Sequence, residues 1–171
     1  MLVSIGRRQE TEDLLDLLMA CHARIRAFSA LAVALSERPA LSPEEVVDAC
    51  DRVSRYFSEA LPLHARDEEE SVLPRLVGRD PALDAALARM RDEHGEHRGP
   101  LQELIARCAT VRASPTDVSL RAAMAPVARD LRAQFDAHLA GEESVVFPAV
   151  RALLSESERR AVVAELRSRR G

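Results

Sequence analysis

Several residue types are scarce or missing in this chain of 171 residues. It has no lysine, no tryptophan, one tyrosine and three cysteines. The cysteines, Cys21, Cys50 and Cys108, are odd in number and lack C-x-x-C spacing, so the sequence predicts neither a disulfide framework nor a thiolate metal site. Aromatic and β-branched runs with period-two alternation are also absent, and no strand is predicted.

The charge of the chain is dense but balanced, with 24 basic residues, all arginine, against 28 acidic ones. Because no run of arginine dominates any element except the last few positions, nucleic acid is not expected as a partner. Residues 1–10 lack an apolar core of signal-peptide length, and no later stretch approaches the roughly 20 apolar residues of a membrane span. We therefore expect a cytoplasmic protein without a membrane partner.

Apolar residues recur at helical spacing along the chain, which predicts an all-α fold. Ser42-Pro43-Glu44-Glu45 is a capping box with proline at the first helical position, and Pro62 is expected to bend the helix that it opens. We expect one domain over residues 1–171, an up-down-up-down four-helix bundle with a short C-terminal helix. The expected helices span about residues 10–36, 42–77, 80–112 and 114–154, followed by a tail helix over about 156–169.

Two segments of the chain are almost alike. Residues 64–74 and 138–148 both begin H-x-x-x-E-E and end in an apolar pair and a proline, and a further histidine precedes each of them. The chain is therefore an internal duplication. Positions i and i+4 lie one above the other on a helix, so each segment directs an imidazole and a carboxylate at the same spot. The candidate metal ligands are His22, His64 and Glu68 from the first half, and His94, His138 and Glu142 from the second.

A shell of nitrogen and oxygen without sulfur, with two histidines and one carboxylate from each half, suits non-haem iron. Glu68 and Glu142 can span two metal ions while each ion takes two histidines. This leaves positions for an oxo or hydroxo bridge and for a small exogenous ligand. The sequence thus predicts two iron ions as the cofactor, with zinc and manganese as alternatives that tolerate the same ligands.

The pattern H…H-x-x-x-E…H…H-x-x-x-E, with a proline after each glutamate pair, resembles hemerythrin-like HHE cation-binding domains over about residues 14–154. The resemblance implies a di-iron four-helix bundle whose ligands are the six residues given above. The oxygen-carrying hemerythrins have H-x-x-x-H on the third helix and H-x-x-x-x-D on the fourth. This chain has neither motif, so the resemblance does not imply reversible oxygen carriage.

Other polar residues stand beside the expected ligands. His97 follows His94 by three positions, and we expect His94 to be the ligand. His97 is then a neighbour of the ligands, a fifth histidine ligand or an exposed residue. Glu69 and Glu143 are either solvated carboxylates or acceptors that orient ligand histidines. We expect plain surface charge at Asp67, Glu70 and Glu93.

Three functions are compatible with these residues. The first is a binding protein, whose di-iron centre captures or senses O2, NO or peroxide in oxidative or nitrosative stress, or handles iron. A sensor of this kind would need a protein partner. The second is an enzyme that disproportionates hydrogen peroxide at the same centre, and the third is a structural bundle with zinc or no metal. The sequence does not decide whether the protein is an enzyme.

Overall fold

The computed structural model describes residues 13–38 and 40–171, and within them we find helices and turns but no strand. The first arm of the bundle is α1 (Leu14–Glu37) and the third is α5 (Pro81–Ala113). The second arm comprises α2 (Pro43–Arg55), a π-turn η1 (Tyr56–Ala60), α3 (Leu61–Asp67), η2 (Glu68–Val72) and α4 (Leu73–Leu76). The fourth arm comprises α6 (Val118–Ala122), α7 (Ala125–Gly141), η3 (Glu142–Val146) and α8 (Phe147–Leu153), and the tail helix is α9 (Glu156–Ser168).

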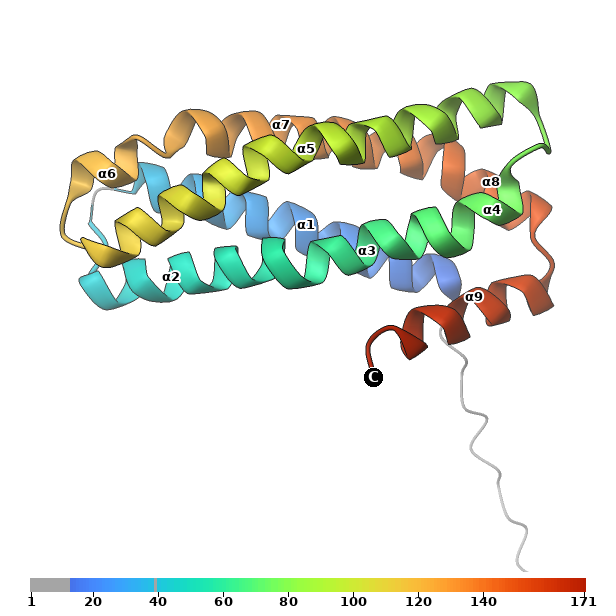
Figure 1. Cartoon of the computed structure of the whole chain (residues 1–171), viewed down its shortest axis with the longest axis horizontal. Helices are drawn as coiled ribbons and strands as arrows, with labels where there is room; N and C mark the ends of the chain where they lie inside the picture. The colour runs from blue at the N-terminus through green and yellow to red at the C-terminus, as the bar shows by residue number, and fades with distance from the viewer. Residues whose placement is uncertain (1–12, 39) are drawn as a thin grey trace, which may run out of the picture.

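These arms form an up-down-up-down bundle, in which α1 and α5 each pack against both α2 and α7 (Figure 1). The predicted all-α class and topology are confirmed. Short capping motifs set the helix starts. Ser42 and Ser155 each close a capping box with the glutamate three residues later, and the Asp80 carboxylate accepts from two backbone N–H groups at the start of α5. Gly78, with φ of +81°, makes the turn between α4 and α5.

Some helix boundaries differ from those expected. The first helix begins at Leu14, and the predicted residues 10–12 lie outside the described residues, as does Pro39. The fourth arm starts at Val118 after the Asp117 cap and breaks at Ala123 and Met124. Pro126 explains the break, because proline has no N–H for the preceding turn and its ring clashes with the carbonyl four residues before it.

The hydrophobic core consists of two clusters at opposite ends of the bundle. One cluster fills the end formed by α2 and the distal part of α5, with Phe135, Leu104 and Val53 among its buried members. The other lies where α4, α8 and the tail helix α9 meet, with the fully buried Leu76 and Val150 among its members. Along α1, Leu18 belongs to the second cluster and Ile25 to the first, and His22 lies between them. A polar layer therefore divides the apolar core.

The two residues that follow α9 fix the tail of the chain to the second arm through Asp67. This carboxylate is only 1% exposed and accepts from Arg169 at 2.9 Å and also from Arg170. Arg169 further donates to the Ser71 hydroxyl at 2.7 Å. The prediction of surface charge at Asp67 was wrong, because it could not include the return of the tail helix onto this turn.

Helix α1 is long and apolar enough to cross a membrane by length and composition alone. This differs from the sequence expectation that no stretch approaches a span. One such helix near the N-terminus is weak support for a membrane span, because the core helix of a helical bundle passes the same test. In this structure α1 packs against α2 and α7 and carries the buried His22.

We expect Asp67→Asn to lower the free energy of unfolding by about 2 kcal/mol or more, because it leaves two arginines facing a neutral side chain in a buried site. Glu103→Gln is the matched control, since Glu103 pairs with Arg107 on the exposed surface of α5. The control should cost less than about 1 kcal/mol. Urea denaturation of both variants measures the difference, and equal stabilities would contradict the role of the tail helix.

Candidate metal centre

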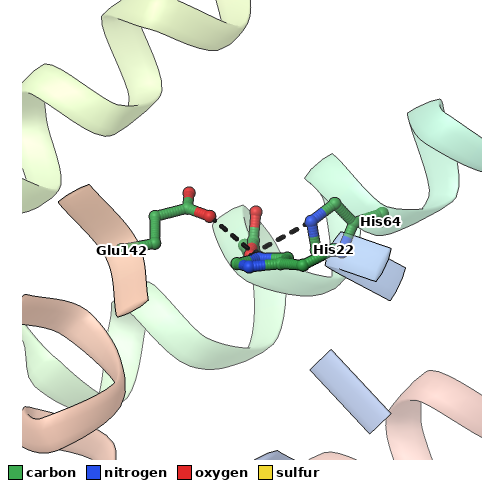
Figure 2. A group of neighbouring side chains, drawn as sticks. His22, His64 and Glu142 are labelled. Carbon is green, nitrogen blue, oxygen red and sulfur yellow. Dashed lines mark ion pairs between the residues drawn. The ribbon is translucent and has the colours of Figure 1, made fainter. Parts of the chain in front are cut away.

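The structure brings all six expected ligands into the polar layer between the two core clusters. His22 comes from α1, His64 from α3, His94 from α5 and His138 from α7, while Glu68 and Glu142 are the first residues of η2 and η3. Five of the six are buried by exposed fraction, and the side chain of His94 is 9% exposed. Figure 2 shows how His22, His64 and Glu142 meet from separate segments of the chain.

The first group of ligand atoms belongs to His22, His64, Glu68 and Glu142, and all of these atoms lie within 4.8 Å of one another. His22 Nε2 is 3.1 Å from Glu142 Oε2 and 3.8 Å from Glu68 Oε1. His64 Nε2 is 3.3 Å from the same Glu68 oxygen. Two ligands that each bind one ion at about 2.1 Å lie roughly 3–4 Å apart, so these spacings fit a shared cation.

The second group belongs to His94, His138 and Glu142. His138 Nε2 is 3.1 Å from Glu142 Oε1, and His94 Nε2 is 3.9 Å from the same oxygen. His94 Nε2 is also 3.5 Å from Glu68 Oε2. Each carboxylate therefore turns one oxygen to the pair His22 and His64, and its other oxygen to the pair His94 and His138.

A π-turn begins at each carboxylate of the centre. The Leu73 N–H donates to the Glu68 carbonyl, and the Phe147 N–H donates to the Glu142 carbonyl, five residues back in both cases. Pro74 and Pro148 come next, and they cannot supply the N–H that an α-helical turn requires. Such π-turns are rare, and they are frequently found at functional sites. The proline shared by the two repeats is thus the sequence signal for this feature. Pro62 likewise follows a further π-turn, η1, and the bend expected there stays a prediction.

Three of the four histidines are oriented by a carboxylate on their Nδ1 atom. His22 Nδ1 is 2.9 Å from Glu143, which Arg26 also holds at 2.8 Å. His94 Nδ1 is 2.8 Å from Glu69. A carboxylate at Nδ1 leaves Nε2 free to bind a cation and makes it more basic. Glu143 and Glu69 occupy equivalent positions in the repeats, and each serves a histidine of the other half.

Glu93 orients His138 in the same way, with a carboxylate oxygen 2.7 Å from His138 Nδ1. The prediction of surface charge there was wrong, because the contact depends on how α5 packs against α7. In the repeat register Glu93 stands opposite Cys21, a free, half-buried cysteine. Among the described residues His64 Nδ1 has no hydrogen-bond partner, so the pseudo-symmetry is broken at this one position.

Glu70 lies on the surface and pairs with Arg66, as expected.

The buried polar atoms at the heart of the layer are short of hydrogen bonds. In the described part of the chain, no such bond reaches Nε2 of His22 or His64, Oε2 of Glu68 or either carboxylate oxygen of Glu142. Buried polar atoms are ordinarily satisfied, and a cation would satisfy all of these at once. The donor set therefore fits a metal, and binding of metal by these six residues stays a prediction.

The pKa values of the histidines reflect the two buried carboxylates. Burial opposes a charged ring at His22, but Glu142, Glu68 and Glu143 outweigh it and raise its pKa to about 10. Burial likewise opposes charge at His94, where Glu68 and Glu69 raise the pKa to about 9. Without a cation, protons on these rings balance the carboxylates. Metal and protons therefore compete for the same nitrogen atoms.

His97 is close to the centre but outside both ligand groups. It is 6% exposed, and its ring contacts those of Phe135 and His138 at centroid distances of 4.8 and 5.2 Å. Burial and the neighbouring His138 and His94 lower its pKa to about 4, which keeps it neutral. Of the three positions left open by the sequence, exposure is therefore wrong, and His97 lies beside the ligands.

The fold and the centre together define a class, namely helical bundles that bind cations between histidines from all four arms and carboxylates from two of them. The model of the hemerythrin HHE cation-binding domain matches residues 13–150, and the chain belongs to this family. A search of curated proteins found no match. The matched range ends within α8, so the tail helix α9 lies beyond it.

We expect Glu143→Ala to weaken binding of Co²⁺, used as a spectroscopic probe, by about 10- to 100-fold, because His22 loses the carboxylate that orients it. Glu96→Ala is the matched control, an exposed glutamate on α5 outside the contacts described above. Titration by absorption spectroscopy measures both affinities. An unchanged affinity in the Glu143 variant would show that this carboxylate does not support the centre.

The raised pKa values of His22 and His94 predict how the stability of the metal-free protein depends on pH. Both folded-state values lie above the ordinary value near 6.5, so their contribution to stability is complete below about pH 6.5 and is lost as the pH rises toward 9–10. Thermal denaturation should show the melting temperature falling over this range. Protein loaded with metal should fall less, because the cation replaces the protons, and equal pH dependence of the two forms would contradict the argument.

Proposed function

We propose that this protein binds two iron ions in the polar layer and uses them to take up O2, NO or peroxide in oxidative or nitrosative stress, or in iron handling. The observation that carries the proposal is the position of Glu68 and Glu142, each with one oxygen toward each histidine pair. Carboxylates shared in this way support two ions about 3.5–4 Å apart, the spacing of two-metal centres.

The proposed uptake of a small molecule favours iron over zinc. Each ion would have two imidazole nitrogens and two carboxylate oxygens, which already completes the tetrahedral shell of structural zinc. Iron in a larger coordination shell would keep positions open for an added ligand. When bound, an iron pair supplies one-electron redox chemistry and a place for a small molecule to coordinate. The surrounding residues bind it, orient the imidazoles through Glu69, Glu93 and Glu143, and exclude water with apolar walls.

Access to the centre also supports the uptake of a small molecule. A cavity of about 220 Å³ reaches His64, His94 and His138 and is bounded otherwise by mostly apolar side chains. Both ligand groups thus contribute a histidine to its wall. A centre with a purely structural role would need no such space.

Metal content per chain tests the proposal. Protein expressed in iron-supplemented cells should contain close to two irons per chain by elemental mass spectrometry, because the centre offers two ligand groups. Glu142→Ala should lose most of this iron, whereas His97→Ala should keep it. Zinc in place of iron, or metal well below one per chain, would contradict the proposal and favour the structural alternative.

The same preparations separate a binding protein from an enzyme. A reversible change in the absorption spectrum on adding NO or O2, without turnover, supports binding. Consumption of hydrogen peroxide that disappears in Glu142→Ala would instead support catalysis, and a consumption rate equal in both proteins would count against it.

A further inference from the structure

The cavity beside the centre is larger than a diatomic ligand requires. Its volume is about 220 Å³. An apolar cavity of about 150 Å³ is known to hold benzene. The space here is therefore sufficient for an organic molecule of ring size.

The walls of the cavity are apolar away from the histidines. Phe57 and Phe135 contribute parallel rings with centroids 5.9 Å apart. Ile25, Leu61 and Leu101 complete this surface. Flat, hydrophobic walls of this kind favour an aromatic or branched aliphatic body.

The charged residues that line the cavity differ in what they contact. Arg66 donates to Glu70 at 2.9 Å, and Glu69 accepts from His94. Arg98 is exposed, and among the described residues its guanidinium has no ion pair or hydrogen bond. It lies one helical turn after His94 on α5. Arg98 is thus the positive group available to an anion that enters the cavity.

We propose that this cavity binds a small organic carboxylate, with its aromatic or branched aliphatic body against Phe57, Phe135 and Leu101 and its carboxylate on Arg98. The fork of an arginine matches a carboxylate in geometry as well as in charge. The inference deepens the proposed function and rests on it for the biological role of the cavity. Binding itself depends only on the cavity residues.

Benzoate is a suitable probe, with benzyl alcohol as an uncharged probe of the same size. Full-length protein carrying its metal should bind benzoate saturably in isothermal titration calorimetry. Arg98→Gln should weaken benzoate by at least about tenfold and change benzyl alcohol little, because one charge-assisted contact is lost. Arg91→Gln, an exposed arginine on the same helix, is the matched control and should change neither.

A second pair of variants tests the apolar wall. Leu101→Trp should fill the cavity and abolish binding of both probes, whereas Leu153→Trp, on the exposed face of α8, should leave it unchanged. Absence of saturable benzoate binding, or equal affinities in the Arg98 variant and the parent, would overturn the proposal; the second result would place benzoate on the metal or elsewhere. Iron content measured on each sample keeps this outcome separate from failure of the proposed function.

Discussion

The arrangement of the four arms depends on two buried carboxylates, Glu68 and Glu142. Ionised groups in an apolar bundle are costly unless charge and hydrogen bonds compensate them. Four imidazoles from four arms surround these carboxylates, and either protons or cations on the imidazoles can provide that compensation. One histidine from each arm therefore lies at the same height along the bundle, and this polar layer divides the apolar core into two clusters.

The internal duplication explains how a single chain places four imidazoles around two carboxylates. Each half supplies a histidine, then an H-x-x-x-E segment, then a π-turn and a proline. The halves also complete one another, because Glu143 supports His22 and Glu69 supports His94. The layer of histidines and carboxylates is therefore close to two-fold symmetric. The symmetry is broken where Cys21 takes the place equivalent to Glu93. The cavity adds a further asymmetry, since it reaches His64, His94 and His138 but not His22.

The tail helix lies outside the residues that the family model matches, but the end of the chain contacts the segment that carries Glu68. Arg169 and Arg170 contact Asp67, the residue before Glu68, and Arg169 also holds Ser71 inside the π-turn that Glu68 begins. Arg75 on α4 pairs with Glu165 of α9 at 2.6 Å and links the same two segments again. The position of the Glu68 carboxylate is thus connected with the packing of the last helix of the chain.

The sequence by itself determined the helical class, the duplication and the six residues that meet in the polar layer. These follow from local rules, since helical spacing, capping boxes and the i to i+4 relation act within one turn or two. Tertiary structure decided what depends on contacts between arms. Glu93 and Asp67 look like surface charge in the sequence and are bound in the structure by His138 and by Arg169, which lie 45 and 102 residues away. For His97 the sequence allows three positions, and the packing of α5 against α7 places its ring beside that of Phe135. The cavity likewise arises only where separate arms fail to fill the space between them, and no single stretch of sequence records that space.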